Sequence, residues 1–365
     1  MFVLAEDIRL NKRQLKSIIS DPEKSADAVN LVYVNDRQEG IERVRKGRGF
    51  VYRIGSKKIS DRYQLERIRR LVIPPAWENV WICRLENGHL QATGTDIKNR
   101  KQYRYHPLWS TVRNHTKFYR LYAFGNCIPK IRAGLKEDLA LKGLPQKKVL
   151  ATMLCLMERT CIRVGNNFYE KLYGSFGLTT LKDQHVKING STMRFMFRGK
   201  KGVFQNISVN NRRLAAIVRQ CRDIPGKELF QYEDPDGTYR CVDSGMVNEY
   251  IRSLSGADFT AKDFRTWAGT VQALMAFREV GGFDSEKEMR SKIVQALDIV
   301  AKRLGNTRTV CRKYYVHPLI ISLYENGKIQ RYLDEAEEPC GPEDLACEEK
   351  LLLAILKKEA AGVIF

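Results

Sequence analysis

The residues of this sequence that could do chemistry are a set of cations and one segment with two adjacent tyrosines, Tyr314 and Tyr315. Arg265 is the most informative cation. The preceding Thr260-Ala261-Lys262-Asp263 has the pattern of a capping box, which predicts that a helix begins just before Phe264. Arg265 is therefore expected near a helix N-terminus, where the helix dipole favours an anion. A lone arginine beside an apolar helix face is usually structural, so this position does not establish a site by itself.

Several common catalytic motifs are missing from the sequence. There is no G-x-x-x-x-G-K-[ST] motif, so no ATP-driven P-loop motor is expected. There is no H-E-x-x-H motif or carboxylate cluster, and the five histidines lack metal-ligand spacing, so we expect neither a metal nor a cofactor. The nine cysteines form no C-x-x-C pair, which favours free thiols in a reducing cytosol. No run of about 18 apolar residues is present to span a bilayer.

Positive charge dominates the composition and indicates a polyanionic partner. The 365 residues include 63 Lys and Arg against 42 Asp and Glu, a net charge of +21. Residues 41–120 hold 19 basic and 6 acidic residues, a net charge of +13. Residues 334–365 hold 9 acidic and 3 basic residues, and their apolar run 351–356 predicts a last helix whose acidic side chains face solvent. This distribution favours a nucleic acid bound by the N-terminal part of the chain.

The basic segment is predicted to be rich in β-strands. Residues 50–54, 80–83 and 89–94 have strand patterns, and the last two are joined at Asn87-Gly88, a strong hairpin signal. Residues 65–71 predict a short amphipathic helix. The run 96–106 then interleaves cations with amides and phenols, which can contact phosphates, sugars and base edges. Its candidate DNA-binding residues are Lys98, Arg100, Lys101, Gln102, Tyr103 and Tyr105.

The rest of the chain is predicted to be mostly helical, with one small sheet. Apolar spacing predicts helices over 118–140 and 146–160. Strands are expected at 185–188 and 193–198, on either side of a turn at Asn189-Gly190, and a second turn at 199–202 leads into a strand at 203–207. From about residue 210 helices are expected to continue to the end of the chain.

Six segments taken together resemble the type IB DNA topoisomerases, most closely their compact bacterial and poxviral branch. The resemblance covers roughly residues 31–325, and the motifs occur in the family's order. Any one fragment is a weak signal, whereas the ordered set is highly specific. The segments are Ile73-Pro74-Pro75-Ala76-Trp77, the run from Gly94 to His106, Cys161-Ile162-Arg163-Val164-Gly165-Asn166, Phe197-Arg198-Gly199-Lys200, Lys262-Asp263-Phe264-Arg265-Thr266-Trp267, and Leu304-Gly305-Asn306 followed by Tyr315.

The resemblance implies the following chemistry and residues. A tyrosine attacks a DNA phosphodiester, giving a 3′-phosphotyrosyl bond and a free 5′-hydroxyl, without ATP or metal. Family motifs assign the nucleophile to Tyr315, with Tyr314 as its packed neighbour. They assign transition-state stabilisation to Arg163 and Arg265, and proton donation to Lys200, with Lys201 as a possible substitute. Poxviral members have His at the position of Asn306, and an amide can hydrogen-bond a phosphate oxygen but cannot exchange a proton.

The resemblance also implies an α+β fold that closes as a C-shaped clamp on duplex DNA. A small β-rich DNA-binding domain is expected over residues 1–112, and a mainly helical catalytic domain with one small sheet over 113–365. The expected protein is a monomer that relaxes supercoils in the cytoplasm, on the DNA of a nucleoid or a virus, without an obligatory protein partner. Two alternatives stay open: a site-specific tyrosine recombinase, which shares the catalytic logic, and a non-catalytic basic DNA-binding protein.

Overall fold

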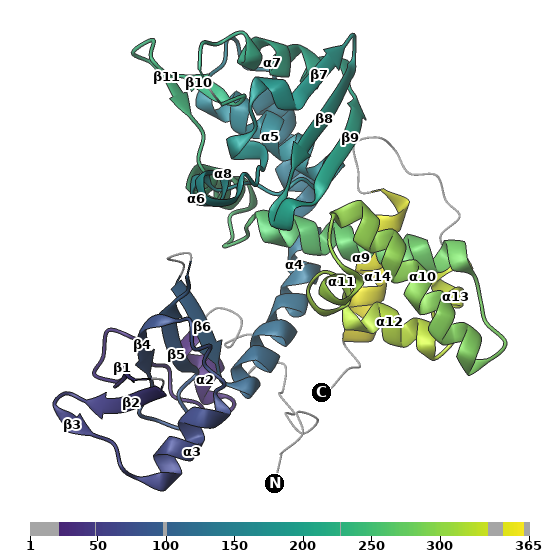
Figure 1. Cartoon of the computed structure of the whole chain (residues 1–365). Coiled ribbons are helices and arrows are strands. Elements are labelled where there is room, and N and C mark those ends of the chain that lie inside the picture. The colour runs from purple at the N-terminus through teal and green to yellow at the C-terminus, as the bar shows by residue number, and fades with distance from the viewer. Residues whose placement is uncertain (1–21, 48, 98–100, 227, 335–345, 361–365) are drawn as a thin grey trace. The chain divides into compact units, whose positions relative to one another are not determined.

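The computed structural model describes residues 22–47, 49–97, 101–226, 228–334 and 346–360. Contacts divide the chain into two units, and the division falls between Arg120 and Leu121, within the long helix α4 (Pro107–Leu139). Each unit has a hydrophobic core of its own. The α+β class is confirmed, with a sheet in the first unit and mostly helices in the second (Figure 1).

A six-stranded antiparallel sheet forms the first unit. Ile41, Ile68, Val80, Ile82 and Ala92 are buried together in its core. The predicted pairing across Asn87-Gly88 is confirmed, since β4 and β5 are antiparallel neighbours. The predicted helix is also present as α3, which begins after Asp61. In the order in which they pair, the strands are β3 (Lys57–Lys58), β2 (Gly49–Ile54), β1 (Ile41–Lys46), β4 (Glu78–Ile82), β5 (Leu90–Thr95) and β6 (Lys101–Tyr105), with the helices α2 (Pro22–Asp27) and α3 (Arg62–Arg70).

The second unit contains the predicted three-stranded antiparallel sheet, in the order β7-β8-β9. Its strands are β7 (Val186–Asn189), β8 (Thr192–Arg198) and β9 (Phe204–Asn210). Alternate residues of β8, Met193, Phe195 and Phe197, are buried in the core, as a half-buried strand requires. Between β8 and β9 the chain makes a tight turn, η4 (Lys200–Gly202), in which Lys201 and Gly202 have φ of +62° and +75°.

Helices make up most of the remaining second unit. The predicted helix over 146–160 is confirmed as α5, and the helix expected over 118–140 forms part of α4. Helix α9 packs against α10, α12 and α14. The helices are α5 (Gln146–Thr160), α6 (Asn167–Tyr173), α7 (Arg212–Arg222), α8 (Ser244–Ser255), α9 (Ala261–Val280), α10 (Glu286–Leu304), α11 (Arg308–Tyr314), α12 (Pro318–Glu325), α13 (Gln330–Asp334) and α14 (Cys347–Ala360), with the short turns η2 (Leu178–Thr180) and η3 (Asp183–His185).

The expectation of unbroken helices from residue 210 is wrong. A short antiparallel pair, β10 (Gln231–Glu233) and β11 (Tyr239–Cys241), lies between α7 and α8. The turn between these strands is stabilised locally, since the Asp236 carboxylate accepts a hydrogen bond from the backbone of Thr238 at 2.9 Å. Asp, Pro and Gly in this segment are typical turn residues, so the strands are short and have little periodicity of their own.

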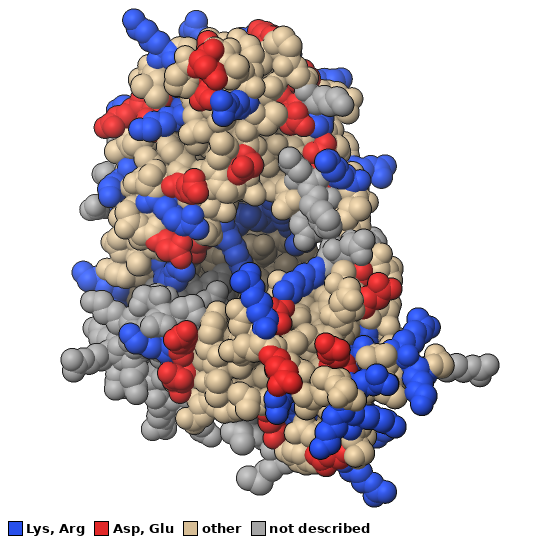
Figure 2. All heavy atoms as spheres, turned by 90° about the vertical axis from the view of Figure 1, so that its left-hand side faces the viewer, with Lys and Arg blue, Asp and Glu red and all other residues tan. Residues whose placement is uncertain are grey.

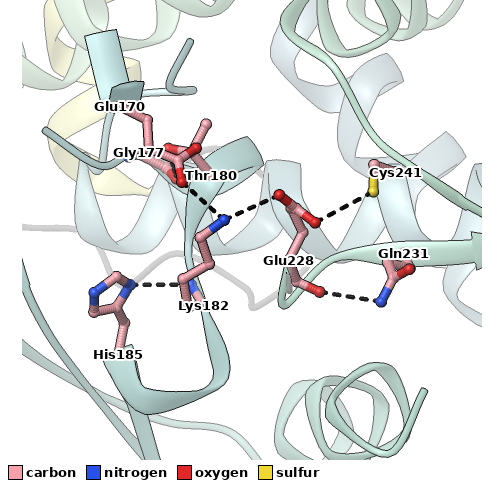
Figure 3. A network of polar contacts seen from close by, with 8 residues as sticks. All are labelled: Glu170, Gly177, Thr180, Lys182, His185, Glu228, Gln231 and Cys241. Atoms are coloured by element: carbon pink, nitrogen blue, oxygen red, sulfur yellow. Dashed lines mark hydrogen bonds and ion pairs between the residues drawn. The ribbon is translucent and has the colours of Figure 1, made fainter. Parts of the chain in front are cut away.

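One polar network joins this hairpin to α6 and to neighbouring loops (Figure 3). The Lys182 ammonium lies 2.8 Å from a carboxylate oxygen of Glu170 and 3.0 Å from one of Glu228. Hydrogen bonding to Lys182 is the main cause that lowers the pKa of Glu228. The Cys241 thiol of β11 in turn lies 3.6 Å from Glu228. Because Lys182 is balanced by two acids, this cluster is structural support rather than a binding site for a further anion.

The C-terminal helix α14 packs on the body of the unit, as the apolar run 351–356 predicts. Leu352 and Ile355 are fully buried. The prediction that the acidic residues of this segment all face solvent is wrong for Glu349, which is 8% exposed. Its carboxylate accepts two hydrogen bonds from Arg132, at 2.9 and 3.0 Å, and one from the Trp267 indole at 2.9 Å. Glu349 thus joins α14 to α4 and α9.

We predict that Glu349→Ala lowers the free energy of unfolding by about 2–4 kcal/mol, because it leaves buried donors of Arg132 and Trp267 unpaired. Glu348→Ala is the matched control, since that neighbouring acid is less buried, and it should change stability by less than about 0.5 kcal/mol. Urea unfolding of both variants measures the difference. Equal stability of the two variants would show that the Glu349 contacts do not hold α14 in place.

Candidate active site

The five predicted catalytic residues lie at the ends of secondary-structure elements in the second unit. Arg163 follows the left-handed C-cap of α5 at Cys161, and Lys200 lies in the turn between β8 and β9. Arg265 is in the first turns of α9, whose predicted capping box is present: the Thr260 N–H donates to the Asp263 carboxylate at 2.8 Å. Asn306 follows Gly305, the C-cap of α10, and Tyr315 is the C-cap of α11.

Arg265 is the most deeply placed of the five. It is 5% exposed, and its guanidinium donates to the backbone carbonyls of Cys161 and, at 2.8 Å, Leu304. These carbonyls end α5 and α10, where helices leave backbone acceptors unpaired and carry partial negative charge. The guanidinium carbon also lies 5.2 Å from the centre of the Tyr315 ring. Arg265 therefore joins two helix ends and faces the predicted nucleophile.

Arg163 and Asn306 form a second contact of the site. The Arg163 guanidinium donates to the side-chain oxygen of Asn306 and, at 3.3 Å, to the carbonyl of Gly305. Burial first, and then the positive charge of Arg265, lower the pKa of Arg163 to about 10. Arg163 is still charged at neutral pH, so two mutually repelling guanidiniums lie side by side. Such an arrangement favours the binding of an anion.

Two buried hydrogen-bond donors of the site have no partner among the residues that the structure describes. They are the Nε of Arg265 and the Nδ2 of Asn306. Neither Arg163 nor Arg265 makes an ion pair with an acidic side chain of the described ranges. A buried donor without an acceptor costs about 1–3 kcal/mol, so native structures rarely keep one without a reason. A phosphate group brings oxygens that accept from several such donors.

The Tyr315 backbone is held both by α11, which it ends, and by α9. Its N–H donates to the Cys311 carbonyl at 2.9 Å, and its own carbonyl lies 3.2 Å from the Thr270 hydroxyl of α9. A Cβ at Gly269 would lie only 2.7 Å from the Tyr315 carbonyl oxygen, so glycine is what permits α9 to approach this segment. Burial raises the pKa of the Cys311 thiol to about 11, so at neutral pH this thiol is protonated and a poor nucleophile.

Four of the five predicted catalytic residues line a cleft of about 1360 Å³ in the second unit. Arg163, Lys200, Asn306 and Tyr315 line it, and so does Tyr314, whose side chain is 37% exposed. The volume is larger than one phosphate requires, and the walls are rich in positive charge. The other basic residues of its lining are Lys201, Lys262, Lys302 and Arg303. Elsewhere, on the face in Figure 2, lysine and arginine side chains are spread widely with acidic ones between them.

The predicted DNA-binding residues belong to the first unit, and Lys98 and Arg100 lie outside the described residues. The other four lie on β6, an edge strand of the sheet. Lys101 makes an ion pair with Asp36, and the Gln102 amide donates to Asp96 at 3.0 Å. The Tyr103 and Tyr105 rings are stacked, with centroids 5.9 Å apart, and are 47% and 45% exposed. The two tyrosines are thus available to a partner, whereas Lys101 and Gln102 are engaged by acids.

Sequence reasoning missed the residues that support the site. Gly269 and Thr270 of α9 contact the Tyr315 backbone, and Gln205 of β9 lies against Gly305. The only signal for Gly269 was a glycine inside a helical pattern, which often marks close packing. Across the described ranges there is no group of three metal-ligating side chains, and none of the described helices is long and apolar enough to cross a membrane.

Two family profiles match the chain. One is described as "Eukaryotic DNA topoisomerase I, catalytic core" and matches residues 100–338; the other is described as "Bacterial DNA topoisomerase IB, N-terminal domain" and matches residues 49–96. The chain is 33% identical over 298 residues to the DNA topoisomerase 1B of Acanthamoeba polyphaga mimivirus, covering 79% of this chain and 88% of that protein. It is 23% identical over 243 residues to the DNA topoisomerase I of monkeypox virus and the DNA topoisomerase 1B of vaccinia virus (strain Copenhagen), covering 64% of this chain and 72% of each relative.

The unpaired donors predict that a small tetrahedral anion stabilises this protein. Sulfate at about five times its dissociation constant should contribute about 1 kcal/mol and raise the Tm by about 2–4 °C, relative to chloride of equal ionic strength. Arg163→Ala should remove this rise. Arg212→Ala is the control, because Arg212 is exposed on α7, and it should keep the rise. Sulfate also stabilises proteins generally, so an equal rise in both variants would contradict a specific anion site.

Proposed function

The chain belongs to the type IB DNA topoisomerase family, and from this premise we propose that Tyr315 is the nucleophile with which it relaxes supercoiled duplex DNA. It is an isomerase that acts on DNA. Both matched profiles and the viral relatives are topoisomerases, which favours this function over a recombinase or a non-catalytic DNA-binding protein. The position of the Arg265 guanidinium over the Tyr315 ring supports Tyr315 rather than its neighbour Tyr314.

In the proposed cleavage step the Tyr315 phenol gives up its proton to solvent, and its oxygen attacks the phosphorus of one DNA strand. A bond from this oxygen to phosphorus forms, and the bond from phosphorus to the 5′ oxygen breaks. The products are a 3′-phosphotyrosyl ester and a free 5′-hydroxyl end, and the duplex that carries this end swivels about the intact strand. Attack by the 5′-hydroxyl reverses both bond changes. Because the phosphotyrosyl ester retains the energy of the broken phosphodiester bond, resealing needs no nucleotide.

The observation that carries this proposal is the pair of unpaired buried donors, Arg265 Nε and Asn306 Nδ2, beside two guanidiniums. In the transition state, negative charge builds up on the non-bridging oxygens of the phosphate. Arg163 and Arg265 present permanently charged, planar donors to such oxygens, and they are already fixed by backbone carbonyls before DNA binds. Donors fixed in advance stabilise a transition state because they need no reorganisation during the reaction.

Asn306 has a narrower role in this proposal than a histidine would have. Its side-chain oxygen is taken by Arg163, so the amide nitrogen is what remains for the phosphate. An amide does not gain or lose a proton near neutral pH, so Asn306 stabilises charge only. The proton that the leaving 5′ oxygen takes up then has to come from another group. We assign that role to Lys200, which lines the same cleft; Lys201 lines it too, and the family motif favours Lys200.

We further propose that the first unit holds the duplex through β6. The exposed stacked pair Tyr103 and Tyr105 offers aromatic faces and hydroxyl groups to sugars or base edges. Lys101 and Gln102 would reach DNA only by exchanging their present acidic partners. The enzyme is expected to work as a monomer that closes around duplex DNA, in the cytoplasm on a nucleoid or a viral genome.

The test is relaxation of plasmids of either supercoil sign, in EDTA and without ATP. The wild-type protein and Tyr314→Phe should relax both plasmids, whereas Tyr315→Phe should have no detectable relaxation and still bind DNA. The two variants remove the same atom from neighbouring residues, so they are matched. Loss of activity in Tyr314→Phe with full activity in Tyr315→Phe would move the nucleophile by one residue, and full activity in both would overturn the mechanism.

A further inference from the structure

Lys200, the proposed proton donor, lies on a turn whose own contacts do not hold its side chain in one position. The turn between β8 and β9 is closed by two backbone hydrogen bonds, from Gly199 N to Val203 O at 2.8 Å and from Gly202 N to Gly199 O at 3.0 Å. The Lys200 and Lys201 side chains are exposed, and neither ammonium has a hydrogen-bond partner among the described residues. A general acid must lie within hydrogen-bond reach of the atom it protonates. Something beyond the turn must therefore hold it over the phosphate.

Gln205, the second residue of β9, connects this turn to the helical part of the unit. It pairs with Phe197, and the alternation of the strand places its side chain on the core side of the sheet. A Cβ at Gly305 would lie 2.8 Å from Gln205 Nε2 and 3.1 Å from its Oε1, and a Cβ at Gly199 would lie 3.3 Å from its Cγ. The side chain thus extends from the base of the turn to the backbone of Gly305, and Figure 1 shows β8 and β9 approaching the helices there.

The backbone that Gln205 contacts is the one that holds the phosphate site. The Gly305 carbonyl accepts from Arg163 at 3.3 Å, and Asn306, the next residue, accepts from Arg163 through its side chain. Gly305 has φ of +57°, a conformation that favours glycine, and the absence of a side chain also leaves the space that the Gln205 amide occupies. The Gln205 side chain is half-buried and makes no hydrogen bond within the described part of the chain, so its contact with the Gly305 turn is one of packing.

We propose that Gln205 is a positioning residue, which docks the Lys200 turn on the Gly305–Asn306 backbone and so aligns the proton donor with the phosphate. This role rests on the proposed function of Lys200. Gln205 touches neither the phosphate nor the nucleophile in this proposal. It acts by fixing the distance between two parts of the cleft: the turn that carries the acid, and the turn that anchors Arg163.

The role of Gln205 is tested by changing whether the leaving group needs a proton. Single-turnover cleavage is measured on a duplex with the natural 5′ oxygen at the scissile phosphate, and on one with sulfur in place of that oxygen. An alkyl thiol has a pKa of about 8.5, so a thiolate leaves without a general acid. With oxygen, Gln205→Ala should slow cleavage about 10- to 100-fold, as a displacement of about 1 Å can. With sulfur, the loss should fall to less than about threefold.

Two further variants keep the test independent of folding. Gln205→Asn retains the amide but is one methylene shorter, so its amide withdraws from Gly305, and it should show the same oxygen-specific loss with an unchanged Tm. Gln220→Ala removes an exposed glutamine of α7 and should cleave both substrates at the wild-type rate. Equal slowing of both substrates by the Gln205 variants, or no slowing of either, would overturn the positioning role.

Lys200→Ala separates this inference from the function on which it rests. This variant should also cleave the oxygen substrate slowly, and sulfur at the leaving position should restore its cleavage rate. If sulfur restores the cleavage rate of Lys200→Ala but not that of the Gln205 variants, only the positioning role is wrong. If Lys200→Ala cleaves the oxygen substrate at the wild-type rate, Lys200 is not the acid, and both proposals are overturned.

Discussion

The site depends on one interaction: the buried guanidinium of Arg265 donates to the carbonyls that end α5 and α10. Cys161 and Leu304, which supply these carbonyls, immediately precede the segments that carry Arg163 and Asn306. Arg265 itself faces the Tyr315 ring. One side chain therefore fixes the relative positions of a second arginine, an amide donor and the predicted nucleophile. Helix ends are suitable anchors, because their carbonyls carry partial rather than full negative charge.

Because Arg265 is paired with backbone carbonyls and not with carboxylates, its positive charge stays available to a ligand. Arg132, elsewhere in the same unit, is surrounded by the carboxylates of Glu158 and Glu349, and these contacts neutralise it. Arg163 and Arg265 are held by carbonyls and an amide, so each keeps its positive charge. Burial first, and then the charge of Arg265, lower the pKa of Arg163 to about 10. Two neighbouring guanidiniums repel each other, and in the proposed function a phosphodiester would relieve both this repulsion and the unpaired donors.

Local sequence signals predicted the parts of the fold that local interactions determine. The turn at Asn189-Gly190 specified the β7–β8 hairpin, and the glycines at 199 and 202 specified the β8–β9 turn that carries Lys200. The capping box specified the start of α9. The β10–β11 pair escaped prediction because its strands are three residues long and have no periodicity to detect. The burial of Glu349 was missed because its partners, Arg132 and Trp267, are far away in sequence.

Within the site, too, contacts between residues far apart in the sequence could not be predicted. The residue types and order of the motifs predicted Arg163, Lys200, Arg265, Asn306 and Tyr315 as catalytic residues. Four of them line one cleft, and the guanidinium of Arg265 lies 5.2 Å from the centre of the Tyr315 ring. The supporting contacts of Gly269 and Gln205 depend on how α9 packs on the tyrosine segment and how β9 packs on Gly305. Such contacts join residues from different elements, so no local pattern marks them.

The proposed mechanism depends above all on transfer of the phosphate to Tyr315. Its most direct test is to trap the covalent complex with DNA, digest both polymers, and locate the remaining nucleotide phosphate by fragmentation mass spectrometry. The modification is expected on Tyr315 alone, with Tyr314 unmodified in the same peptide. A phosphate on Tyr314 or on any other side chain would contradict it.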